Sequence, residues 1–138
     1  MQNPYAVYSQ LDVTTASPLK VVLMLYDGAI SFLNKAVQAA KEGDLKNKNL
    51  HANSARDIVM ELNNALKMEE GGEIARSLRG LYFFMNRHIM QSNWSNDTKG
   101  FEEVIQLLGN LKDAWQYVHD HRDGAPETAP RAFSGFHA

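Results

Sequence analysis

Apolar residues recur three and four positions apart along most of the chain, which is the spacing of one face of an α-helix. The clearest stretch, residues 18–41, carries two such rows side by side. The rows are Leu19, Leu23, Tyr26, Ile30, Leu33, Val37 and Ala40, and Val22, Leu25, Ala29, Phe32, Ala36 and Ala39. Three later stretches repeat the pattern, from Ala52 to Leu66, from Ile74 to Met85 and from Phe101 to Val118. We therefore expect four amphipathic helices, near residues 18–42, 46–67, 73–93 and 98–120.

The strongest helix breakers stand between these stretches or outside them. No proline lies between Pro18 and Pro126, which argues against a loop-rich β fold. Glycine breaks stand at Gly43, Gly71-Gly72 and Gly100, and they divide the chain into segments of similar length. Helices of similar length joined by short connections predict an all-α fold, an antiparallel four-helix bundle.

Capping residues mark several of the expected helix ends. Ser17 is a preferred N-cap, and Pro18 after it suits the first helical position. Gly43 stands where a helix that ends at Lys41-Glu42 would place a left-handed residue. The run Asn96-Asp97-Thr98 offers a second N-cap, directly before the last helix.

The two ends of the chain differ from the helical stretches. Residues 1–16 contain Tyr5, Tyr8 and Leu11 and are too apolar for a solvated linker, so we expect a short N-terminal arm or cap. Residues 122–138 are rich in Pro, Gly and small residues, which is typical of a flexible tail. The expected organisation is an arm at 1–16, a bundle at 17–121 and a disordered tail at 122–138.

Composition and charge exclude several classes of protein. Cysteine is absent from the 138 residues, which removes disulfide scaffolds, thiolate zinc sites and cysteine nucleophiles. The 14 Lys and Arg against 16 Asp and Glu give a net charge of −2, which does not indicate nucleic-acid binding. The longest apolar run, Val21 to Tyr26, is too short to span a bilayer. The N-terminus lacks the features of a secretory signal, so we expect a cytoplasmic protein without membrane insertion.

No arrangement of residues predicts catalysis or a cofactor. Helical bundles often hold di-iron sites built on Glu-x-x-His, but none of the glutamates is followed by histidine three positions later. His119 and His121 are two residues apart, so on a helix they point to different faces. No phosphate-binding glycine loop and no Gly-x-Ser-x-Gly motif occurs. We predict no catalytic, cofactor-binding or metal-ligating residue and expect a protein that is not an enzyme.

The helices carry more apolar residues than a bundle core requires. These extra residues fall outside the main rows: Val21, Met24, Met60, Phe83, Phe84, Met90, Trp94, Ile105 and Leu107. They are either the broad edges of core faces or the lining of a groove for an apolar partner helix. In the second interpretation the N-terminal arm covers the groove while it is empty, through Tyr5, Tyr8 and Leu11. We then expect that deleting residues 1–12 leaves thermal stability nearly intact.

Three blocks of the sequence resemble the FliS family of bacterial flagellin-specific secretion chaperones. The first block is Thr15-Ala16-Ser17-Pro18 followed by Leu23-Met24-Leu25-Tyr26-Asp27-Gly28-Ala29-Ile30. The second block is Gly71-Gly72-Glu73-Ile74-Ala75, then Leu78, Leu81-Tyr82, Met85 and Asn93. The third block is the helix start at Asp97 with Asp113-Ala114-Trp115. The resemblance runs from about Tyr5 to Val118.

This resemblance implies a cytosolic helical bundle that binds the C-terminal segment of newly made flagellin. It implies that the protein prevents premature flagellin polymerisation and supports export, with components of the flagellar export apparatus as further partners. It implies no enzyme activity and no cofactor. Two alternatives remain open at this point: a generic helical adaptor or self-associating bundle, and a catalytic bundle.

Overall fold

The computed structural model describes residues 3–8 and 17–121, and every regular element in this part of the chain is helical. A short 3-10 helix, η1, comes first at Pro4–Ala6. The long helices are α1 at Pro18–Lys41, α2 at Leu45–Asn64, α3 at Met68–Ser95 and α4 at Thr98–Asp120. The all-α prediction is confirmed. Leu11 and residues 122–138 lie outside the described residues, so the expected flexible tail stays a prediction.

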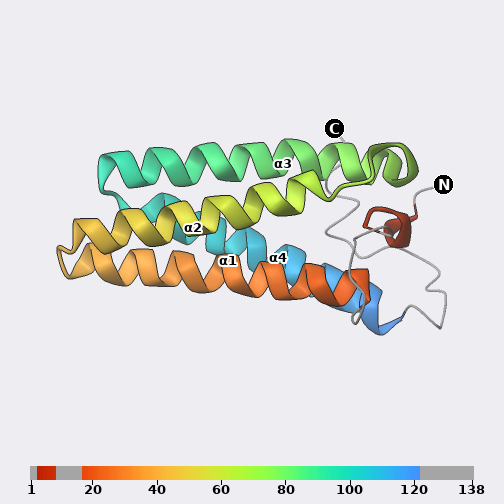
Figure 1. Ribbon diagram of the computed structural model, residues 1–138, viewed down its shortest axis with the longest axis horizontal. Coiled ribbons are helices and arrows are strands. Elements are labelled where there is room, and N and C mark those ends of the chain that lie inside the picture. The colour runs from red at the N-terminus through yellow and green to blue at the C-terminus, as the bar shows by residue number, and fades with distance from the viewer. Residues whose placement is uncertain (1–2, 9–16, 122–138) are drawn as a thin grey trace.

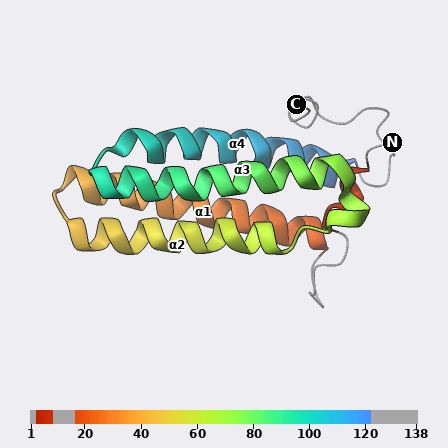
Figure 2. The same ribbon diagram turned by 90° about the horizontal axis from the view of Figure 1, so that it is seen from above.

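The four helices form an antiparallel bundle (Figure 1). Each helix packs against the next one in the chain, and α4 packs back against α1. Figure 2 shows the same arrangement from above, with α3 between α4 and α2. Consequently α1 and α3 lie on opposite corners of the bundle, and each pair of neighbouring helices presents one outer face. The predicted four-helix bundle is confirmed.

The helix ends form as their capping residues predict. The Ser17 hydroxyl accepts a hydrogen bond from the Lys20 backbone N–H, and Gly43 follows α1 with a φ of 73°. The Asp44 carboxylate accepts from the Asn47 N–H at 3.1 Å, and Asp97 caps α4 in the same way. These bonds satisfy backbone donors that would otherwise be left unpaired at the starts of α1, α2 and α4.

One of the expected glycine breaks is confirmed and another is not. Gly72 interrupts α3 with the non-helical angles φ 55° and ψ −133°, which a residue with a Cβ tolerates poorly, so a short helical turn that begins at Met68 is separated from the long helix after it. Gly100 is not a break, because it lies in the first turn of α4 and the chain turns at Asn96, whose φ is 57°. A Cβ on Gly100 would come 2.5 Å from the Ser92 Cβ, so this glycine permits α3 and α4 to approach closely.

The core follows the apolar rows read from the sequence. The row of the last helix predicts Leu111 and Trp115 in the core, and both are buried. The largest fully buried side chains include Trp115 and three tyrosines from different parts of the chain: Tyr8, Tyr26 and Tyr82. No described helix is apolar over a length that could cross a membrane.

The start of the N-terminal arm belongs to the core. Val7 and Tyr8 are fully buried, and η1 lies at the end of the bundle where α1 and α3 begin (Figure 1). The Lys67 backbone N–H donates to the Val7 carbonyl at 2.9 Å, and the Tyr5 hydroxyl donates to the His121 carbonyl at 3.0 Å. The boundary expected at residue 17 therefore does not mark the edge of the core. Val7 and Tyr8 are therefore core residues and do not act as a cover over a surface groove.

Candidate partner-binding surface

Some of the predicted partner-binding residues share the outer face between α2 and α3. The Arg56 Nε of α2 donates to the Asn86 Oδ1 of α3 at 2.9 Å, which marks where these helices meet. Phe83 and Met90 stand three and four residues from Asn86, so they lie on the same side of α3. Met60 stands four residues after Arg56, and the antiparallel register places it near Phe83.

Phe84 lies on a different face, although it is the neighbour of Phe83. Its ring stacks on His88 with the ring centres 5.0 Å apart. The His88 Nε2 pairs with the Glu103 carboxylate of α4 at 3.0 Å. Phe84 is therefore part of the α3–α4 face. The structure does not bring the two phenylalanines together, and partner binding by either of them stays a prediction.

Val21 and Met24 lie on α1, on the opposite corner of the bundle from α3. Met24 is 62% exposed and Val21 is half-buried. They cannot line one groove together with Phe83 and Met90, because α2 and α4 stand between α1 and α3. Among the arm residues, Tyr5 is half-buried and Tyr8 has no exposed surface through which it could meet a partner in this arrangement.

The face between α2 and α3 carries several of the large exposed apolar side chains. We call it the α2–α3 surface and define it by its large apolar side chains: Leu45, Met60, Phe83, Met90 and Trp94. Phe83 and Met90 are 42% and 45% exposed, and Trp94 is 88% exposed. The Arg79 guanidinium lies over the Phe83 ring, 5.7 Å from the ring centre. Arg79 therefore places a positive charge at the edge of the α2–α3 surface.

Leu45 was missed by the sequence analysis. It is the first residue of α2 and is 51% exposed. It precedes the apolar row that begins at Ala52, so the helical pattern gives no signal for it. Leu50 is also exposed and was missed for the same reason.

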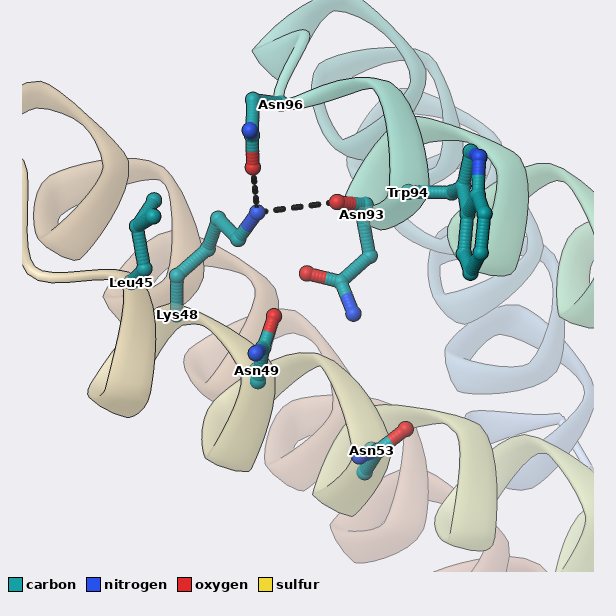
Figure 3. A pocket seen from close by; sticks show the side chains of 7 residues that line it. All are labelled: Leu45, Lys48, Asn49, Asn53, Asn93, Trp94 and Asn96. Atoms are coloured by element: carbon teal, nitrogen blue, oxygen red, sulfur yellow. Dashed lines mark hydrogen bonds between the residues drawn. The ribbon is translucent and has the colours of Figure 1, made fainter.

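A polar pocket of about 400 Å³ adjoins the α2–α3 surface at the start of α2 and the end of α3 (Figure 3). Its lining residues are Leu45, Lys48, Asn49, Asn53, Asn93, Trp94 and Asn96. The buried Lys48 ammonium donates to the Asn93 carbonyl at 2.8 Å and to the Asn96 Oδ1. Burial lowers the pKa of Lys48 because it disfavours the charged form. The start of α2 and the end of α3, which line the pocket, lie at the opposite end of the bundle from η1 (Figure 1).

A buried network of tyrosines occupies the core near the arm. The Tyr82 hydroxyl is hydrogen-bonded to the hydroxyls of both Tyr8 and Tyr26. Burial raises the pKa of all three phenols well above their ordinary value. These groups stay neutral and serve packing and hydrogen bonding. No group of three His, Asp or Glu side chains in residues 3–8 and 17–121 is arranged to hold a metal ion.

The sequence also matches a known protein family. The family model described as "Flagellar protein FliS" matches residues 1–122. The chain belongs to the FliS family.

Several FliS proteins from distant bacteria resemble it along most of their length. It is 37% identical over 116 residues to the flagellar secretion chaperone FliS of Bacillus subtilis, an alignment that covers 84% of this chain and 86% of the relative. It is 39% identical over 113 residues to FliS of Vibrio cholerae, with 82% of each chain covered. It is also 39% identical over 107 residues to FliS of Salmonella typhimurium, covering 77% and 79% of the two chains. All three relatives are named as chaperones, which is not an enzyme class.

Proposed function

We propose that this FliS-family protein is a flagellar export chaperone that binds the C-terminal segment of newly made flagellin in the cytosol. Binding keeps flagellin from polymerising and holds it ready for the flagellar export apparatus. The proposal draws on the relatives, which are named flagellar secretion chaperones. It adds the partner segment and the compartment, which those names do not contain.

The exposed apolar row on α3 is the observation that carries this proposal. Phe83, Met90 and Trp94 are large, exposed and spaced along one side of the helix. An amphipathic segment in water exposes its own apolar stripe and self-associates unless another surface covers it. The α2–α3 surface offers such a segment a helix-sized apolar site, with methionines that adapt to its shape.

The binding must also be reversible, because an exported protein has to leave its chaperone. A segment that becomes ordered on binding loses part of its interaction energy to that ordering. A half-exposed surface on a folded bundle suits this purpose, because its residues stay soluble when the partner leaves. The arm is not part of the proposed surface, since Tyr8 is in the core.

Calorimetric titration with a synthetic flagellin C-terminal peptide tests the proposal. We expect one peptide to bind each bundle, while a peptide of the same length from the flagellin N-terminus does not bind. Size measurement before and after the titration addresses the self-associating alternative. A free protein that is monomeric and increases in size only when the C-terminal peptide is added supports the chaperone proposal. Stable oligomers whose size does not change when the peptide is added contradict it.

A further inference from the structure

Lys48 is a buried cation without an acidic partner. None of the carboxylates in the described residues forms an ion pair with it. Its ammonium group carries three N–H donors, and carbonyl oxygens of Asn93 and Asn96 accept from it. Those neutral acceptors satisfy hydrogen bonds but leave the charge itself uncompensated. A charge that is partly removed from water in this way is stabilised by a group of opposite sign that reaches it.

The surrounding pocket offers amide groups in place of a counter-charge. The Asn93 Oδ1 is buried and accepts no hydrogen bond from the described residues. Asn49 and Asn53 line the same pocket from α2 (Figure 3). Each carboxamide presents donors and an acceptor, so together they match the N–H and C=O groups of a peptide backbone. Buried polar atoms without a partner are rare in folded proteins, and this one faces a pocket in which the N–H of a ligand can supply the missing hydrogen bond.

The walls of the pocket provide apolar contacts and an electrostatic field that favours a negatively charged ligand. Leu45 and the exposed Trp94 stand on either side of it. Leu45 and Lys48 belong to the first turns of α2, where the helix dipole favours negative charge. The pocket thus combines a cation, peptide-like hydrogen-bonding groups and two apolar walls within about 400 Å³, a volume typical of ligand sites.

We infer that this pocket binds the C-terminal carboxylate of a partner polypeptide. A chain end brings a carboxylate, unpaired peptide groups and a last side chain to one point, which matches the three kinds of lining. An acidic side chain inside a helix does not match, because its backbone groups are already bonded within that helix. The carboxylate pairs with Lys48, a peptide N–H donates to the Asn93 Oδ1, and the last side chain packs on Leu45 and Trp94.

The occupant is the end of the flagellin segment, and this assignment rests on the proposed function. The pocket adjoins the α2–α3 surface beside Trp94, so a helix bound along that surface reaches the pocket with its last residues, which leave the helix there and so keep their N–H groups free. Lys48 then sets the direction and register of the bound segment.

Two versions of one peptide test this inference on the unmodified protein. The flagellin C-terminal peptide is made once with a free carboxylate and once amidated, and each is titrated into the full chain by calorimetry. We expect the free acid to bind roughly 10- to 100-fold more tightly, as for a charge-assisted hydrogen bond. In Lys48→Gln we expect this preference to disappear. The exposed Lys46 provides the control, since Lys46→Gln should keep the preference.

A second variant does not depend on changing a buried residue. Asn49 is exposed, so the Asn49→Asp variant should fold. Its new carboxylate repels the carboxylate of the free-acid peptide, so binding of that peptide should weaken far more than binding of the amidated peptide. Equal binding of the two peptides to the unmodified protein would overturn the carboxylate site and leave the chaperone proposal intact. A preference that survives in both Lys48→Gln and Asn49→Asp would also overturn it. If neither peptide binds the unmodified protein, the proposed function and this inference are both rejected.

Discussion

The Tyr8 hydroxyl lies 2.8 Å from the Tyr82 hydroxyl, and this contact joins the N-terminal arm to α3 inside the core. The Tyr8 hydroxyl also donates to the Leu62 carbonyl of α2 at 3.1 Å. Its ring packs edge-on against Trp115 of α4, with the ring centres 5.3 Å apart. One residue of the arm therefore contacts three of the four helices.

These contacts reverse the expectation for the arm. Deleting residues 1–12 should lower thermal stability markedly, because it removes the buried Val7 and Tyr8. Tyr8→Ala alone should cost about 3–5 kcal/mol of unfolding free energy, as for other large aromatic truncations. Tyr8→Phe keeps the ring and should cost about 1–2 kcal/mol through the lost hydrogen bonds. Urea denaturation measures both. A deletion variant as stable as the full chain would restore the idea of a freely leaving arm.

The buried phenols make the fold sensitive to alkaline pH. Burial raises the pKa of Tyr8, Tyr26 and Tyr82 well above 10.0, so the folded protein keeps protons that the unfolded chain releases near that pH. The folded state then binds more protons than the unfolded state, and stability falls as pH rises above about 10. Tyrosinate absorbance and circular dichroism should show these phenols ionising together with the loss of helix. Ionisation of all tyrosines in a fully helical protein would contradict this prediction.

Helix-interior glycines should respond to alanine according to the space around them. A Cβ at Gly80 or Gly109 would meet nothing within 4 Å, so Gly80→Ala and Gly109→Ala should each stabilise the protein by up to about 1 kcal/mol. Gly100→Ala is the matched contrast, because its Cβ would come 2.5 Å from the Ser92 Cβ. Thermal denaturation of the three variants should rank Gly100→Ala lowest. A destabilised Gly80→Ala would mean that helix propensity does not govern that site.

The two tryptophans should behave in opposite ways. Trp115 is fully buried, and Trp115→Ala should cost about 3–5 kcal/mol of stability. Trp94 is 88% exposed, and surface substitutions usually change stability by less than about 0.5 kcal/mol. Trp94→Ala should therefore leave the fold intact. Chemical denaturation compares the two variants directly, and equal losses would require a different packing of α3.

The sequence predicted the helices, the bundle and the main core well, for a physical reason. The rows that contain Leu33 and Trp115 repeat at the helical period, and such rows bury one face of each helix. The arm was harder to predict, because Tyr8 precedes the first long helix and no repeating pattern shows that its ring enters the core. The surplus of apolar residues is visible in the sequence, but its division between outer faces depends on which helices pack side by side. Phe83 and Phe84 are about 100° apart on a helix, which already separates them.

The polar pocket could not be read from the sequence. Lys48 and Asn49 lie at the start of α2, whereas Asn93 and Asn96 lie at the end of α3, far away in the sequence. Only the antiparallel packing of α2 and α3 brings the two pairs together. Lysine and asparagine on a helix usually face solvent, so neither residue type signals a pocket.

Phe83 and Phe84 allow the most direct test of the proposed binding surface. They are neighbours of one residue type with similar exposure, 42% and 40%, but they lie on different faces of α3. Titration calorimetry with the flagellin C-terminal peptide compares Phe83→Ser with Phe84→Ser, and circular dichroism checks that both variants are folded. We expect Phe83→Ser to lose about 1–3 kcal/mol of binding free energy and Phe84→Ser to bind almost as well as the unmodified protein. Unchanged affinity in a folded Phe83→Ser, or a larger loss in Phe84→Ser, would contradict the assignment of flagellin to the α2–α3 surface.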